Sequence, residues 1–204
     1  MGFFSKRRKK RVIKEYSRKA FHVLAGFVLV SGYYFLMTTY SKELALLAVL
    51  AVLLGYMVFE SIRLSYVPWI NRVVGVLFRK HEYEKPSSPV NFLMAFIICF
   101  ALFEFEIALV AVLMLIFGDM ISAVMGVTFG KTKLYGDKTY VGTLSGFAMN
   151  ILVGYAVLGN GNWEVFVGMA VVATVVELFT TRLDDNMTVP LATVFIGHLL
   201  FNFL

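Results

Sequence analysis

The chain has 204 residues, of which 59% are hydrophobic and 16% are charged, and its formal net charge is +6. Soluble globular domains carry fewer apolar residues and about 25% charged residues, so this composition excludes an ordinary soluble enzyme. The chain has one cysteine, Cys99, which also excludes a fold held together by disulfides.

Seven apolar segments approach the length of about 20 residues that a helix needs to cross a bilayer. No alternating pattern of a membrane β-barrel is present, so helices are the expected way to pair the backbone in lipid. We therefore predict an all-α polytopic membrane protein with about seven transmembrane helices. The predicted spans are residues 20–39, 44–62, 88–103, 107–126, 143–158, 165–180 and 189–204.

The third predicted span is marginal in length, and a mixed segment, residues 67–78, precedes it. This segment combines Trp69 and Arg72 with apolar residues. Such a mixture is typical of a helix that lies at the membrane surface.

The basic residues predict how the helices are oriented. Short cytoplasmic segments of membrane proteins are enriched in lysine and arginine. With a cytoplasmic N-terminus, 18 of the 19 basic residues fall on the cytoplasmic side, and Lys42 is the exception. We interpret residues 1–19, which hold nine of them, as a basic cytoplasmic segment, and residues 20–204 as a single transmembrane domain.

Two carboxylates, Asp119 and Glu177, stand inside otherwise uncharged predicted spans. A charge at mid-membrane costs about 2.5 to 3.5 kcal/mol on insertion scales, so such residues usually face the interior of a helix bundle. Ser122 and Gly126 share a helical face with Asp119. Close helix packing through small residues would explain this glycine but not the aspartate. For Glu177, contact with water at the inner membrane surface is the alternative.

The predicted cytoplasmic loop at about residues 127–142 is rich in glycine, lysine and threonine. Glycine backbone can approach phosphate oxygens closely, and lysine adds positive charge. An ordinary positively charged loop would explain the lysines but not the glycines. The predicted nucleotide-binding residues in and around this loop are Gly126, Gly130, Lys131, Lys133, Lys138, Thr139 and Gly142.

A second polar group, Asp184, Asp185 and Asn186, follows the sixth predicted span. Mg²⁺ in proteins is usually held by one or two carboxylates together with substrate phosphates and water. We therefore expect Asp119, Asp184 and Asp185 to be the metal ligands. The same three-residue sequence is also common at the start of a helix, which is the alternative explanation.

Four short polar motifs follow one another along the chain. They are Arg18-Lys19-x-x-His22-x-x-x-Gly26, Gly118-Asp119-x-x-Ser122-x-x-x-Gly126-x-x-x-Gly130-Lys131, Lys138-Thr139-x-x-Gly142-Thr143, and Glu177 followed by Asp184-Asp185-Asn186-x-Thr188-x-Pro190. The combination resembles the family of membrane lipid-alcohol kinases that use CTP, which includes dolichol kinase, phytol kinase and the CTP-dependent diacylglycerol kinase of fungi. The resemblance covers about residues 18–191. The family's nucleotide motif usually reads Lys-Lys-Thr-x-Glu-Gly, and this chain has Asp137 and Val141 in place of its first lysine and its glutamate.

The resemblance implies transfer of the γ-phosphate of CTP to the hydroxyl of a membrane isoprenoid alcohol, of dolichol or polyprenol type, at the cytoplasmic face. Catalysis of phosphoryl transfer is mainly positioning and charge neutralisation. We expect Asp119, Asp185 and His22 to be catalytic, with Mg²⁺ as the cofactor, and Arg18 and Lys19 to contact the nucleotide. An ordinary histidine at the membrane surface is the alternative for His22. The expected location is the cell membrane, or the endoplasmic reticulum of a eukaryote, and we expect no nucleic-acid partner.

Two other functions fit parts of the pattern. A cytidylyltransferase that forms a CDP-lipid would also need acidic metal ligands and a basic loop. A small ion-coupled transporter would use Asp119 and Glu177 as an ion path, but such transporters are commonly built from repeated halves. No internal repeat is visible in this sequence.

Overall fold

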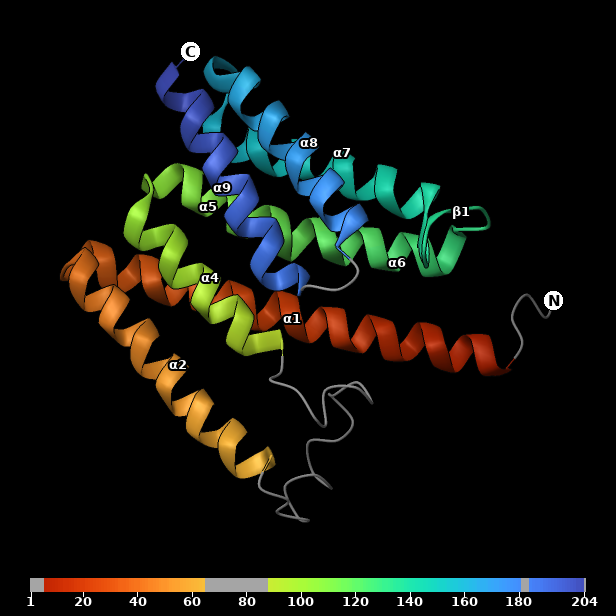
Figure 1. The fold of residues 1–204 in the computed structure, drawn as a ribbon, viewed down its shortest axis with the longest axis horizontal. Helices are drawn as coiled ribbons and strands as arrows, with labels where there is room; N and C mark the ends of the chain where they lie inside the picture. Colours follow the sequence, from red (N-terminus) through yellow and green to blue (C-terminus); the bar gives the residue numbers. More distant parts are fainter. Residues whose placement is uncertain (1–5, 65–87, 181–183, 204) are drawn as a thin grey trace.

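The computed structural model describes residues 6–64, 88–180 and 184–203. Within these ranges nearly all residues are helical (Figure 1). The elements in chain order are α1 (Lys6–Thr39), α2 (Lys42–Leu64), α4 (Ser88–Leu102), α5 (Phe105–Leu113), the π-helical turn η2 (Met114–Gly118), α6 (Asp119–Phe129), β1 (Lys133–Tyr135), β2 (Lys138–Thr139), α7 (Tyr140–Leu158), the 3-10 turn η3 (Asn160–Asn162), α8 (Trp163–Phe179) and α9 (Asp185–Phe203).

Six of the described helical segments are long and apolar enough to cross a membrane, and α4 is a shorter apolar helix. The elements α5, η2 and α6 form one of the six, without a break. These seven segments correspond to the seven predicted spans, so the prediction of an all-α polytopic membrane protein is confirmed. The surface helix expected at residues 67–78, and Arg182, lie outside the described residues.

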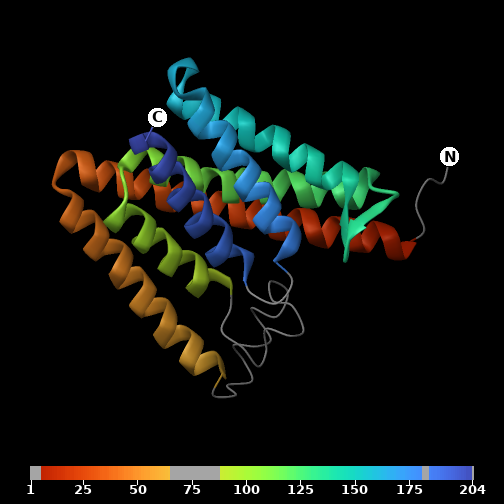
Figure 2. The same ribbon diagram turned by 45° about the horizontal axis from the view of Figure 1, so that its top comes forward.

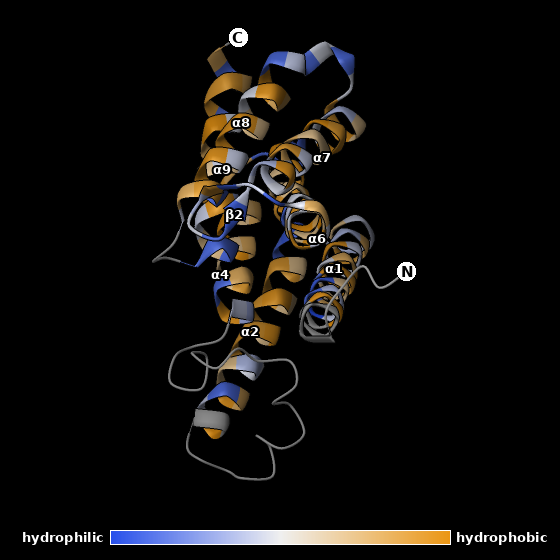
Figure 3. Ribbon diagram, turned by 90° about the vertical axis from the view of Figure 1, so that its right-hand side faces the viewer, coloured by the Kyte–Doolittle hydropathy of each residue, from blue (hydrophilic) through white to orange (hydrophobic). Residues whose placement is uncertain are grey.

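The segment formed by α5, η2 and α6 lies at the centre of the bundle. In its most apolar stretch 61% of the residues are buried, against 33% or fewer in the other five long segments. Helices α1, α7, α8 and α9 pack around it, and α2 lies at the edge against α1 and α4 (Figures 1 and 2). The hydrophobic residues cover most of the helical ribbon, and hydrophilic residues gather around the hairpin of β1 and β2 (Figure 3).

Aromatic rings join α1 to α4. Phe92, Phe96 and Phe100 of α4 recur every four residues, so they share one helical face, and all three are buried. Tyr33 of α1 packs against this face, with its ring centroid 5.5 Å from that of Phe96 and 4.6 Å from that of Phe100. Such tilted and edge-to-face pairs stabilise contacts beyond the apolar area that they bury.

Two features of the fold add detail to the sequence analysis. Helix α1 begins at Lys6, so much of the basic segment expected at residues 1–19 continues directly into the first span. The predicted nucleotide loop contains an antiparallel hairpin, in which Tyr135 pairs with Lys138. Gly136 stands at its turn with φ of +55°, a conformation that favours glycine. Strands of three and two residues are too short to leave an alternating pattern in the sequence.

The π-helical turn η2 ends at Gly118, immediately before Asp119. Asn150 of α7, which is 1% exposed, lies directly against this glycine, and a methyl group on Gly118 would overlap the amide oxygen of Asn150. Single π-helical turns within α-helices often occur at functional sites. Here the turn and the buried asparagine both lie next to the first residue of α6.

We expect Gly118→Ala to destabilise the protein by about 1 to 3 kcal/mol, the usual cost of overpacking a buried contact. Asn150→Ala added to Gly118→Ala should recover part of this loss, because it removes the overlapping amide. Thermal unfolding of the two variants in detergent is the measurement. Gly32→Ala is the control, since nothing lies within 4 Å of a methyl group at that position. Equal stability of Gly118→Ala and wild type would contradict the prediction.

Candidate active site

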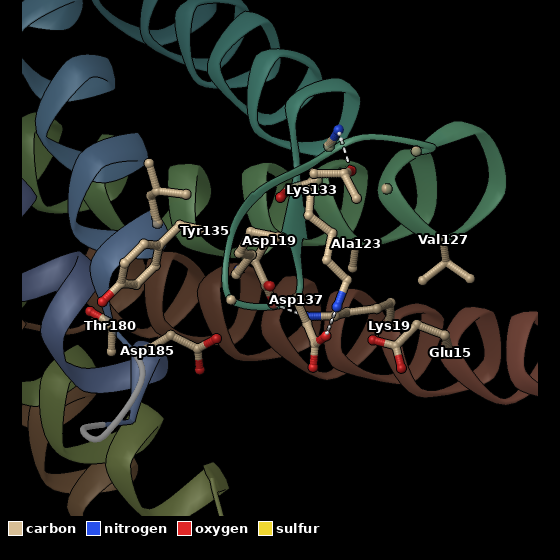
Figure 4. A pocket seen from close by; sticks show the side chains of 18 of the residues that line it. Glu15, Lys19, Asp119, Ala123, Val127, Lys133, Tyr135, Asp137, Thr180 and Asp185 are labelled. Atoms are coloured by element: carbon tan, nitrogen blue, oxygen red, sulfur yellow. Dashed lines mark hydrogen bonds and ion pairs between the residues drawn. The ribbon is translucent and has the colours of Figure 1, made fainter.

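A polar cavity of about 790 Å³ lies at the end of the bundle where α6 ends and α7 begins (Figure 4). Its walls come from α1, α6, the hairpin, the end of α8 and the start of α9. Ten of the thirteen predicted site residues line it: Arg18, Lys19, Asp119, Gly126, Gly130, Lys133, Lys138, Thr139, Gly142 and Asp185. Segments far apart in the sequence therefore converge on one pocket.

The first ion pair of the pocket joins α1 to α6. The ammonium of Lys19 donates a hydrogen bond to Oδ2 of Asp119. Their side chains are only 6% and 8% exposed. A buried charge is tolerated when it is paired and hydrogen-bonded, so this contact explains how an aspartate is held within an apolar span.

The second ion pair joins the hairpin to α8. Oε1 of Glu177 accepts hydrogen bonds from Nζ of Lys138 at 2.6 Å and from Oγ of Ser122 at 2.8 Å. The Glu177 side chain is 9% exposed, whereas that of Lys138 is 33% exposed and reaches the pocket. Burial by itself lowers the pKa of Lys138, but the negative charges of Glu177 and Asp119 raise it above its ordinary value. Lys138 is therefore a cation at the pocket wall.

Glu177 was given no role in the kinase prediction, yet its side chain is bonded to residues of the predicted site. Its carboxylate links three elements, because Ser122 lies one turn after Asp119 on α6 and Lys138 lies on β2. The signal that marks it in the sequence is a lone carboxylate in an apolar span.

The glycines of the predicted nucleotide loop have a packing role. A methyl group on Gly142 would lie 2.6 Å from the carbonyl oxygen of Ser122 and 3.1 Å from Cα of Gly126. Helices α6 and α7 thus approach closely through small residues. Thr139 caps α7, since its Oγ1 accepts a hydrogen bond from the backbone N–H of Gly142 at 3.2 Å. Contact of the glycines with phosphate stays a prediction.

Asp184 caps helix α9. Its Oδ1 accepts from the backbone N–H and the side-chain amide of Asn186, at 2.9 and 2.8 Å, and its Oδ2 accepts from Oγ of Ser88 at 3.1 Å. It does not line the pocket. The helix-start explanation of this sequence therefore accounts for Asp184, whereas Asp185 faces the pocket (Figure 4).

The carboxylates of the pocket fit a magnesium ion whose other ligands are phosphate oxygens and water. Among the described residues, no group of three or more His, Cys, Asp or Glu side chains is placed to hold a metal ion. Asp119 and Asp185, from α6 and α9, nevertheless line the same pocket. One or two carboxylates are enough for Mg²⁺ when phosphate oxygens and water complete its shell.

Two further predicted residues, His22 and Lys131, lie outside the pocket lining. His22 packs edge-on against Phe92, with ring centroids 5.5 Å apart, and its buried Nε2 has no hydrogen-bond partner among the described residues. Lys131 is exposed, and neither it nor His22 lines the pocket. Lys133 lines the pocket and forms an exposed ion pair with Asp137 at 2.9 Å.

Comparison with known proteins gives relatives along most of the chain. Phytol kinase 1, chloroplastic, of Arabidopsis thaliana is 29% identical, and the match covers 96% of this chain and 70% of that protein. Probable phytol kinase 2, chloroplastic, of Glycine max is 28% identical, with 93% and 66% covered. An uncharacterized protein of Rickettsia prowazekii is 24% identical, with 87% and 90% covered.

No family model matches the chain, and no solved structure matches it. The kinase relatives nevertheless match more than nine tenths of the chain. The chain spans about two thirds of the length of these plant proteins. It is similar along most of its length to the phytol kinases, and this similarity supports a relationship to the membrane lipid-alcohol kinases.

Proposed function

We propose that this protein transfers the γ-phosphate of CTP to the hydroxyl of a membrane isoprenoid alcohol, at the cytoplasmic end of the bundle. The observation that carries the proposal is that Lys19, Asp119 and Lys138 line one pocket, where Lys19 pairs with Asp119 and Lys138 pairs with Glu177 behind the wall. Such a pocket offers both cations for phosphate and carboxylates for a metal. The plant relatives are named for phytol, an isoprenoid alcohol, so phytol is the first acceptor to test, beside dolichol and polyprenol.

In this proposal the phosphate chain of the nucleotide lies between α1 and the hairpin. Lys19, Lys133 and Lys138 all line the pocket and supply positive charge there. The reaction needs in-line positioning and neutralisation of charge on the transferred group. Asp119 and Asp185 would hold Mg²⁺, which neutralises phosphate charge when it is bound.

We propose that the acceptor hydroxyl approaches between α1 and α4. His22 lies at this seam, and its Nε2 is buried without a partner among the described residues. A general base must come within hydrogen-bond reach of the proton that it accepts. His22 is the first candidate for that role, and Asp185 is the second.

The decisive experiment supplies purified protein in lipid nanodiscs with CTP labelled at the γ-phosphate. We expect label to appear in phytol or in a longer isoprenoid alcohol, and to depend on Mg²⁺. Parallel reactions with γ-labelled ATP and GTP identify the donor, and diacylglycerol tests a different class of acceptor. Absence of transfer from every donor to every acceptor, with folded protein, would refute the proposal.

Label position separates the kinase from the cytidylyltransferase. A kinase moves the γ-phosphate into lipid, whereas a cytidylyltransferase transfers the cytidylyl group and so moves the α-phosphate. Recovery of α-label in lipid, without γ-label, would therefore establish the second activity in place of the first.

A further inference from the structure

One part of the pocket wall is aromatic and is not explained by phosphate binding. Tyr135 of β1 lines the pocket and is 46% exposed. Figure 4 shows its ring on the other side of Asp119 from Lys19 and Glu15. The pocket thus offers, beside its charged side chains, the face of one aromatic ring, and Asp185 lies near this ring in Figure 4.

The hairpin holds Tyr135 in place and turns it toward the pocket. Lys133 and Tyr135 are both exposed, and Leu134 between them is partly buried, as expected where alternate strand residues face opposite sides. Phe179 of α8 supports the tyrosine, with ring centroids 5.2 Å apart and an angle of 64° between the rings. This contact fixes the ring but leaves nearly half of the residue uncovered.

The hairpin also places Tyr135 directly across from Lys138, the cation proposed to contact phosphate. Tyr135 and Lys138 are partners in the antiparallel pairing. Directly opposed residues in such a pair have Cβ atoms only about 5 Å apart. Any ligand held by Lys138 through one group therefore has Tyr135 within reach of its next group.

We propose that Tyr135 is the platform on which the base of the donor nucleotide stacks, with the triphosphate extending toward Lys138 and Lys19. This subsite rests on the proposed use of a nucleoside triphosphate. The volume of about 790 Å³ falls within the range of sites that enclose whole small-molecule ligands. Bases stack readily on exposed aromatic side chains, and every base offers a face for this contact. Tyr135 therefore adds affinity for nucleotides in general and does not by itself select cytosine.

An aromatic pair near a membrane surface also fits a simple anchoring role, because tyrosine is common at both membrane interfaces. The two explanations differ in what they imply for ligands. A base platform contributes to binding of CTP but not of inorganic tripolyphosphate, which has no base. If Tyr135 is only a membrane anchor, its removal should have the same effect on the binding of both ligands.

The test measures binding of CTP and of inorganic tripolyphosphate, each with Mg²⁺, to the full chain in nanodiscs. In Tyr135→Ala we expect CTP to bind about 5- to 150-fold more weakly, the usual range for loss of one base stack. Tripolyphosphate should bind within twofold of wild type. Tyr135→Phe should keep nearly full affinity for CTP. Tyr140→Ala is the matched control, because Tyr140 is also an exposed tyrosine and does not line the pocket.

Three outcomes would refute the proposal that a nucleotide base stacks on Tyr135. Unchanged CTP binding in Tyr135→Ala would exclude stacking, and an equal loss for CTP and tripolyphosphate would assign Tyr135 to the structure of the hairpin. A wild-type protein that binds neither ligand would refute the proposed function together with this subsite. Lys138→Met separates the phosphate region from the base platform, since it should weaken the binding of both CTP and tripolyphosphate.

Discussion

Asp119→Asn should reduce phosphoryl transfer by about 100-fold or more, the usual cost of removing one electrostatic contact to a transition state. Asp119 lines the pocket and is one of the two carboxylates that we propose to hold Mg²⁺. The amide keeps the size of the side chain but cannot carry its negative charge. The measurement is transfer of γ-label from CTP to lipid alcohol at saturating Mg²⁺. Near-normal turnover would refute the assignment.

The same substitution leaves Lys19 as a buried cation without its partner. Breaking one side of a buried ion pair typically costs about 3 to 5 kcal/mol, so the single variant should unfold at lower temperature. The double variant Lys19→Met with Asp119→Asn removes both charges and should recover much of the stability but none of the activity. Glu106→Gln is the control, because Glu106 is an exposed glutamate at the far end of the bundle. A double variant no more stable than Asp119→Asn would show that the ion pair does not govern stability.

Glu177→Gln should lower kcat by about 100-fold, the loss that a misplacement of about 1 Å can cause, without raising the KM for CTP. The reason is that Glu177 orients the ammonium group of Lys138 by a hydrogen bond. Its carboxylate also competes with phosphate for the positive charge of Lys138. Removal of the carboxylate leaves the pocket more positive, so ground-state binding is kept while the position of Lys138 is lost. Steady-state kinetics with varied CTP measure the two parameters separately.

We expect Lys138→Met to give the opposite pattern, with a raised KM for CTP, because it removes the proposed phosphate contact. Glu164→Gln serves as the matched control, since Glu164 lies exposed at the opposite end of the same helix α8. An increase in KM with unchanged kcat in Glu177→Gln would mean that Glu177 does not act by orienting Lys138.

The helices follow from the sequence because lipid imposes a simple length and polarity requirement on each span. The residues that share the pocket could be grouped from their motifs, but their partners could not. Lys19 and Asp119 are 100 positions apart, and no local periodicity reports such a contact. The same holds for Lys138 and Glu177, whose pairing depends on the packing of α8 against α7.

Other details were hidden for local reasons. The π-helical turn before Asp119 adds a backbone irregularity with no residue that marks it. Asp184 and Asp185 are adjacent and chemically identical, yet the start of α9 assigns one to the helix cap and turns the other to the pocket. Composition and spacing cannot tell which of the two aspartates is the cap. That depends on which side chain can reach the unpaired backbone N–H groups at the start of α9.

The ion pair of Lys19 with Asp119 has a consequence for how the protein is made. A lone lysine is costly in the bilayer and stays at its hydrated surface where it can. Chains are synthesised at about 5 to 20 residues per second, so Asp119, 100 residues later, is added roughly 5 to 20 s after Lys19. We therefore expect the first helix to enter the membrane before Lys19 has its partner. Its final depth is set only when α6 arrives, which makes the docking of α1 a late step in assembly.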